Sequence, residues 1–180
     1  MPADPVGPAD LVAAAVDALR AAELDPDNPA LRAVFVEQAT AVAQQGWDAF
    51  DALLPLLADG DAVCRSAAAQ MLGRLGQADR TLGHPVCDCL IAAVADEVDD
   101  GVVDAMAVAA HEAGLTVEGA SNLLLRAPTH RRMGAYHQAM VVSSSADNEP
   151  IRRVLRIASD DPDPEVRRWA ALGLETSELD

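Results

Sequence analysis

The chain has 180 residues, enough for one domain with a substantial buried core. Its formal net charge at pH 7 is −16, and a field of this sign repels phosphate, which argues against nucleic acid and favours a basic protein as partner. Hydrophobic residues make up 51% of the chain but aromatic residues only 3%. This composition favours closely packed helices over a β-sheet.

The cysteine content and the N-terminal sequence predict a cytoplasmic protein. Three cysteines do not make a disulfide framework and suit a reducing compartment. Residues 1–12 lack the basic region of a signal peptide. The longest uncharged stretch, residues 133–146, is too short and too polar to cross a bilayer, so no membrane association is expected. All 13 basic residues are arginine, which is typical of GC-rich bacterial coding sequences.

The charge is unevenly distributed. Residues 1–125 hold 20 acidic residues and 5 arginines, a net charge of −15, whereas residues 126–180 hold 9 and 8, a net charge of −1. For the arginines of the second part we consider two interpretations, salt bridges to nearby carboxylates or an end of the molecule that binds an anionic patch. These clustered arginines are Arg131, Arg132, Arg152, Arg153, Arg156, Arg167 and Arg168.

Apolar residues recur with helical spacing (i, i+3, i+4, i+7) along the chain and predict helices in pairs. The pairs cover approximately residues 8–46, 47–76, 84–114, 117–146 and 149–176. The apolar stripes of the first helices start at Val12, Phe50, Val86, Ala120 and Ile151, and those of the second helices at Leu31, Cys64, Val103, Met133 and Val166. Successive second helices start 30 to 39 residues apart, and no segment alternates like a strand, so we expect one all-α domain built from an internal repeat.

Acidic turns precede the second helices and predict where they begin. Asp163 can cap the last helix, with Pro164 at its first position, where a missing N–H costs nothing. Residues 27–32 repeat this arrangement. The remaining predicted caps are Asp61 and either Asp99 or Asp100.

Glycines are predicted to end two of the second helices. Gly73 and Gly76 follow the stripe that starts at Cys64, and Gly114 follows the stripe that starts at Val103. Glycine is the residue most often found just past a helix end, because it adopts positive φ without strain.

The second helices resemble those of the HEAT-repeat family, in the short form also seen in phycobilin-lyase-type proteins. That pattern is an acidic turn, an apolar residue, an Arg, a pair of small residues and a closing Leu-Gly. Residues 64–76 and 166–174 match it closely and residues 31–39 in part, whereas residues 103–114 and 133–141 match poorly because Asp104 and Gly134 take the Arg position.

This resemblance implies a right-handed α-solenoid of about five helix pairs, with the second helices lining the concave face. It also implies a structural ladder in which Arg32, Arg65 and Arg167 contact the acidic turns of neighbouring units.

Solenoids bind extended partners on their concave face, so the sequence predicts a non-enzymatic adaptor or regulatory scaffold for another protein. Trp169 is either an anchor of that surface or a core residue, because it lies on the apolar stripe of its helix. The candidate partner-binding residues are Arg65, Gln70, Arg74, Asp104, His137, Gln138, Arg167, Arg168 and Trp169.

The acidic turns are a second candidate surface for a basic partner. One version of this hypothesis is an inhibitor or immunity-type protein that covers a cationic active site. The acidic residues concerned are Asp25, Asp27, Asp59, Asp61, Asp96, Asp99 and Asp100.

An alternative function is a small-molecule-binding or lyase-like protein with a pocket around His111, Tyr136 and His137. The single His111–Glu112 pair cannot supply the roughly six ligands of a di-iron site. Cys87 and Cys89 are spaced two apart, which is not a zinc or redox motif. We therefore expect no metal, no cofactor and no enzymatic activity.

Overall fold

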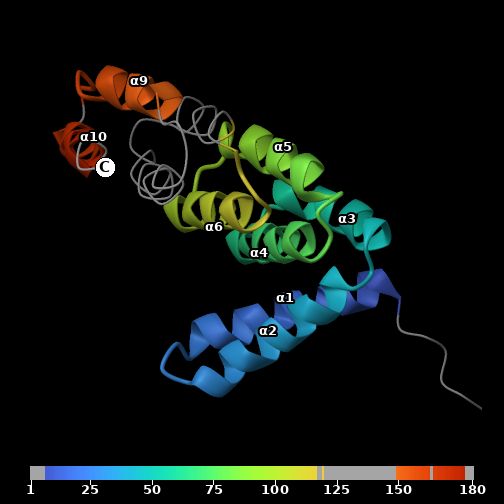
Figure 1. The fold of residues 1–180 in the computed structure, drawn as a ribbon. Helices are drawn as coiled ribbons and strands as arrows, with labels where there is room; N and C mark the ends of the chain where they lie inside the picture. The colour runs from blue at the N-terminus through green and yellow to red at the C-terminus, as the bar shows by residue number, and fades with distance from the viewer. Residues whose placement is uncertain (1–6, 117–118, 120–148, 163, 177–180) are drawn as a thin grey trace, which may run out of the picture.

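The computed structural model describes residues 7–116, 119, 149–162 and 164–176, and every regular element in these ranges is helical. The chain is therefore all-α over the described residues, as the sequence predicts. The predicted fourth pair, residues 117–146, lies almost wholly outside them. The elements, drawn in Figure 1, are α1 (Pro8–Leu24), α2 (Pro29–Ala43), α3 (Trp47–Leu53), the 3-10 helix η1 (Leu54–Ala58), α4 (Ala62–Ala78), α5 (Gly83–Val94), α6 (Asp100–Glu112), α9 (Glu149–Ala158) and α10 (Pro164–Thr176).

The starts of the second helices follow the predicted capping chemistry. The side chain of Asp61 accepts a hydrogen bond from the amide of Val63 and caps α4. Asp99, and not Asp100, caps α6 by accepting from two amides of its first turn. At α2 the cap is Asn28, followed by proline at the first helical position. Pro164 likewise begins α10; the predicted cap of α10, Asp163, lies outside the described residues.

Gly114 ends α6 as predicted. It has φ +97°, its amide donates to the carbonyl of His111 at 3.0 Å, and the amide of Leu115 donates to the carbonyl of Ala110 at 2.9 Å. This pair of bonds is a Schellman motif, in which glycine supplies the left-handed residue that closes the helix.

The prediction that Gly73 and Gly76 end a helix is wrong, because α4 continues to Ala78. Both glycines lie where α4 meets the C-terminal part of α6. A Cβ at Gly73 would lie 2.7 Å from the Cα of Ala109, and one at Gly76 would lie 2.6 Å from the Cβ of Ala113. The glycines therefore allow two helix backbones to approach closely, a role that only the packed structure reveals.

The helices form two layers (Figure 1). In one layer α2 packs against α4, and α4 packs against α6; in the other α1 contacts α3, and η1 contacts α5. The helix α4 joins the two layers, because it also packs against α1, α3, η1 and α5. In the C-terminal part α9 and α10 pack against each other.

The core confirms some of the predicted apolar stripes and corrects others. The stripes that start at Val12 in α1 and at Val103 in α6 are buried throughout. In α2, however, Val34 is exposed and Phe35 begins the buried face. In α5, Cys87 is buried while Cys89 is only half-buried. This helix is packed by α6, α4 and η1, so its buried face is wider than a single stripe.

Gly73→Ala should destabilise the protein, because the new Cβ meets backbone atoms of Ala109 at 2.7 and 3.0 Å that cannot rotate away. Overpacking of this kind costs about 1–3 kcal/mol, partly offset by a gain of about 1 kcal/mol in helix propensity. Urea titration of the unfolding free energy measures the net loss.

Gly60→Ala is the matched control, since no atom lies within 4 Å of a Cβ placed there. We expect its stability to stay within about 0.5 kcal/mol of the wild type. Equal stability of both variants would contradict the close packing of α4 on α6.

Candidate interaction surface

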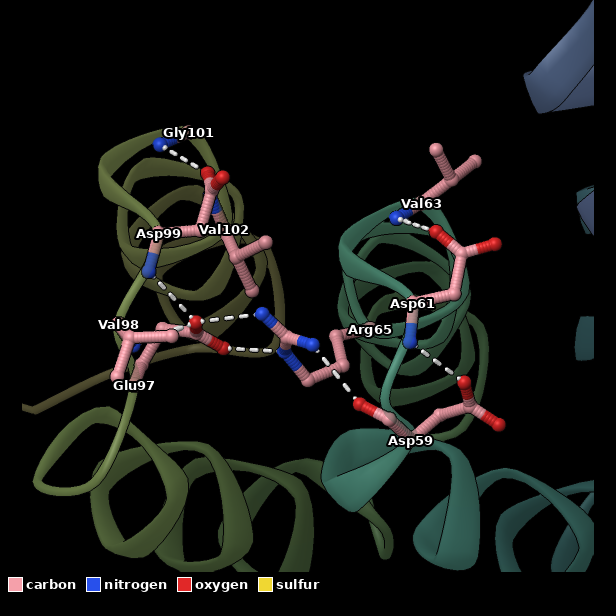
Figure 2. Close-up of polar contacts among 9 residues, drawn as sticks. All are labelled: Asp59, Asp61, Val63, Arg65, Glu97, Val98, Asp99, Gly101 and Val102. Atoms are coloured by element: carbon pink, nitrogen blue, oxygen red, sulfur yellow. Dashed lines mark hydrogen bonds and ion pairs between the residues drawn. The ribbon is translucent and has the colours of Figure 1, made fainter.

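The turns that precede α4 and α6 lie next to each other and are joined by Arg65 (Figure 2). The guanidinium of Arg65 makes two bonds to the carboxylate of Glu97, Nε to Oε2 at 2.7 Å and Nη2 to Oε1 at 2.9 Å. Its Nη1 donates to the carbonyl oxygen of Asp59 at 2.8 Å. The two paired side chains are 11% and 2% exposed. Arg65 thus joins the turn before α4 to the turn before α6, and the carboxylate that it binds is a glutamate.

The acidic residues of these turns also fix the backbone. Oε1 of Glu97 accepts bonds from the amides of Val98 at 2.7 Å and Asp99 at 2.8 Å. In the preceding turn, Oδ1 of Asp59 accepts from the amide of Asp61 at 2.8 Å. Several of the predicted surface acids therefore organise the turns themselves.

Burial alone would raise the pKa of Glu97, since it disfavours the charged carboxylate. The hydrogen bonds from Arg65, Asp99 and Val98 and the charge of Arg65 outweigh this effect and hold the pKa of Glu97 below its ordinary value. The charged form is therefore the one that the fold stabilises.

Arg167 and Arg32, the other two arginines of the implied ladder, bind different kinds of acceptor. Arg167 donates from Nη1 to the carbonyls of Asp161 at 2.8 Å and Pro162 at 2.9 Å, which repeats the bond from Arg65 to the carbonyl six residues earlier. Arg32 instead donates to the side chain of Gln70 at 2.9 Å. The acidic cap Asp61 is paired with Arg20 of α1, at 2.7 Å.

A groove with a volume of about 320 Å³ runs between α4 and α6 and is bounded by Arg32 of α2. Three of the predicted partner-binding residues, Gln70, Arg74 and Asp104, line it together. Their binding role stays a prediction. The other lining residues, which the sequence did not single out for this surface, are Ser66, Gly101, Ala105, Val108, Ala109 and Glu112.

A second hollow, of about 190 Å³, lies at the N-terminal ends of α4 and α6 and continues this groove. It is bounded by Glu23 at the end of α1 and by Asp99, and it shares Ser66 and Gly101 with the first groove. The depression therefore follows the seam between two helices from the acidic turns toward their C-terminal ends.

Among the remaining predicted site residues, those that the structure describes do not line this groove. Arg167 and Arg168 are exposed on α10. His111 is half-buried on α6 and is not among the residues that line the groove. Trp169 belongs to α10, but its side chain lies outside the description, as do Tyr136, His137 and Gln138.

The two thiols of α5, one of which lines a cavity, are held in their protonated form. A cavity of about 410 Å³ beside α5 is lined in part by His84, Cys87 and Asp88, and His84 Nδ1 lies 3.0 Å from Asp88 Oδ2. However, the Cys87 thiol donates to the carbonyl of Ala110 at 3.5 Å, and burial raises its pKa. Burial likewise raises the pKa of Cys89 to about 12, so these thiols stay protonated and weakly nucleophilic at neutral pH.

In the described ranges of the chain, no group of three or more histidine, cysteine, aspartate or glutamate side chains is arranged to hold a metal ion. Nor does that part of the chain contain a helix with the length and apolar character that crossing a membrane requires.

Arg65→Met should lower the unfolding free energy by about 3 kcal/mol, because it leaves the charge of Glu97 buried without its partner. Thermal and urea unfolding measure this loss. Arg80→Met, at an exposed arginine, is the control and should change stability by less than about 0.5 kcal/mol. The double variant Arg65→Met/Glu97→Met should be more stable than Arg65→Met alone, because it removes the buried charge that the single variant leaves without a partner. A double variant that is no more stable would contradict an uncompensated charge on Glu97 as the cause of the loss.

The stabilisation by Glu97 should depend on pH. Its pKa is lower in the folded chain than its ordinary value of 4.5, so its contribution is complete above pH 4.5 and is lost as the pH falls through the folded-state pKa. The difference in unfolding free energy between wild type and Glu97→Gln should therefore shrink on acidification below pH 4.5. A difference that stays constant from pH 7 to acidic pH would exclude a charged Glu97 as the stabilising form.

Comparisons of the chain with family models, with curated proteins and with solved structures found no match. The functional assignment therefore rests on the residues and the geometry described above.

Proposed function

We propose that the chain is a non-enzymatic protein-interaction module, an adaptor or regulatory scaffold, built as a right-handed α-solenoid of about five HEAT-like helix pairs. The successive packing of α2, α4 and α6 supports this architecture, since it is the packing expected when the second helices of consecutive repeats stack. The backbone bonds of Arg65 and Arg167, each to a carbonyl six residues earlier, support it as well.

The groove along the seam of α4 and α6 carries the proposal. It follows α4 from Ala62 to Arg74, and the twelve steps between these residues, at 1.5 Å each, span about 18 Å. An open groove of this length suits a peptide segment or a helix of another protein. Polar side chains line the groove along its length. A typical small-molecule site is instead a closed and mostly apolar cavity.

The chemistry of the groove allows specific recognition of a protein segment. Its α6 side includes Ala105 and Ala109, small residues that let a partner approach closely, and Val108, which is 38% exposed. Arg74 lines the α4 side, whereas Asp104 and Glu112 line the α6 side. Opposite charges on the two walls would orient a bound segment and reject those of reversed polarity.

The net charge of −16 favours a basic partner. An inhibitor-type protein that covers a cationic surface is one form of this function. The three free cysteines suit a reducing, cytoplasmic location.

Val108→Arg should abolish partner binding, because the long charged side chain fills the groove. The tagged protein and its variant are used to capture partners from a lysate of the source cells, at about 50 and 300 mM salt, with detection by mass spectrometry. A stoichiometric basic partner should be retained by the wild type, lost with Val108→Arg, and weakened at the higher salt.

Val34→Arg is the matched control, since Val34 is also an exposed valine of the same helix layer, 45% exposed, and does not line the groove. Both variants should keep the helical circular dichroism signal of the wild type. Retention of the same partner by Val108→Arg, or co-purification of a metabolite without any protein, would overturn the proposed function.

A further inference from the structure

The hollow at the N-terminal ends of α4 and α6 is smaller than an ordinary ligand pocket. Its volume is about 190 Å³, whereas small-molecule sites typically have about 300–1,000 Å³. It continues into the longer groove, because Ser66 and Gly101 line both. A hollow of this size at one end of a binding groove suits a single side chain of a bound protein segment.

The walls of the hollow combine aliphatic groups with carboxylates. Val63 and Val102 supply the aliphatic part, and Figure 2 shows them at the adjoining starts of α4 and α6. Glu23, in the last turn of α1, and Asp99, before α6, supply two carboxylates from two separate elements. Lysine and arginine match such walls, because each has an apolar stem that packs on aliphatic groups and a cationic head that binds carboxylates.

The charges of these two carboxylates are not neutralised within the described part of the chain. Neither Glu23 nor Asp99 forms an ion pair there, and Asp99 uses only Oδ1, to accept from amides of the first turn of α6. Arg20 and Arg65, which belong to the same helices and turns, are bound to carboxylates that do not line the hollow. The N-terminal ends of α4 and α6 each add about half a positive charge, which together offset only one of the two carboxylates.

The rest of the groove has no comparable excess of negative charge. Beyond the hollow it is lined by Arg32 and Asp104, and toward the C-terminal ends of the helices by Arg74 and Glu112, with one charge of each sign in both places. The hollow is therefore the negative end of the groove. A segment with a basic residue near one end is bound in one orientation by such a distribution of charge.

We propose that the hollow is a side-chain pocket for one lysine or arginine of the segment that binds the groove. The stem packs against Val63 and Val102, and Glu23 and Asp99 bind the cationic head. This pocket presupposes the proposed function, because a protein segment must occupy the groove for its side chain to reach the hollow. It gives a short-range reason for a basic partner, separate from the long-range field of the whole chain.

A phage-displayed library of random peptides, selected on the full chain, tests the pocket. The peptides have about 12 residues, enough to follow the groove even as a helix. Selected peptides that fail to bind Val108→Arg are the groove binders, and fluorescence anisotropy at physiological salt measures their affinities. We expect them to share a lysine or arginine, whose replacement by methionine weakens binding to the wild type at least about tenfold.

Two variants at exposed positions change the charge of the pocket. Glu23→Arg should weaken the groove binders at least about tenfold, because it places a positive charge where the cationic head binds. Asp99→Asn should weaken them in the same direction and keeps the helix cap, since asparagine caps as well as aspartate. On the Glu23→Arg protein, replacing the basic residue of the peptide by methionine should no longer weaken binding, because the two effects are coupled.

Glu37→Arg is the matched control. Glu37 is exposed on α2 and lines neither the groove nor the hollow, and its replacement changes the net charge as Glu23→Arg does. Charges farther apart than about 8 Å are largely screened at physiological salt, so this variant should change the affinity less than about threefold.

The outcomes separate the pocket from the proposed function. Groove binders that tolerate both Glu23→Arg and the loss of their basic residues would overturn the pocket and leave the function of the groove standing. Equal weakening by Glu23→Arg and Glu37→Arg would do the same, since only the overall charge would then matter. A library that yields no peptide dependent on Val108 would overturn the proposed function and the pocket with it.

Discussion

The two-bond ion pair between Arg65 and Glu97 is the contact on which the described body of the molecule most depends. Two charges leave water to form it, and such a transfer is compensated only by good geometry and by hydrogen bonds to the remaining lone pairs. Both conditions are met. The guanidinium binds the carboxylate at 2.7 and 2.9 Å, and two backbone amides donate to the same carboxylate. One side chain of α4 thereby determines the path of the turn that begins α6.

The same ion pair connects the stability of the fold with its surface. Since the turn before α6 is fixed by Glu97, the positions of Val98 and of the capping residue Asp99 are fixed with it. At the other end of the two helices, Gly73 and Gly76 allow α4 to approach α6 closely. The seam between α4 and α6 is therefore held by an ion pair near the N-terminal ends of the two helices and by close backbone packing toward their C-terminal ends.

The sequence was a good guide where a property depends on local chemistry. The caps at Asp61 and Asp99, the stop at Gly114 and the buried stripes of α1 and α6 follow from hydrogen-bonding groups and apolar spacing within one element. Prediction failed where a neighbouring element decides the outcome. Gly73 is inside a helix because Ala109 packs on it, and Cys87 is buried in place of Cys89 because α5 is packed from more than one side.

The residues of the candidate surface could likewise be predicted where local spacing decides their position, and not where a neighbouring element does. Gln70 and Arg74, four residues apart, share one face of α4, and Asp104 was assigned to the same surface because the second helices were expected to stack; the structure brings all three to one groove. Arg65 was assigned to that surface as well, yet it lies in an ion pair, because its partner Glu97 comes from another turn that no periodicity identifies. The sequence did not predict that Leu24 and Val98 are exposed, at 84% and 72%. The exposure of Val98 depends on a turn whose backbone amides are held by Glu97, a residue that no periodicity identifies.

The acidity of the chain consequently has two separate roles. Some carboxylates of the acidic turns are used within the fold, since Asp61 and Asp99 cap helices and Glu97 pairs with Arg65. Others, such as Asp25 and Asp27, are exposed and remain in contact with solvent. The long-range negative field is the sum of both sets, whereas only exposed carboxylates can contact another molecule directly. A protein of this kind can therefore lose a surface carboxylate with little change in stability, whereas loss of a capping or bridging carboxylate changes the fold that presents the surface.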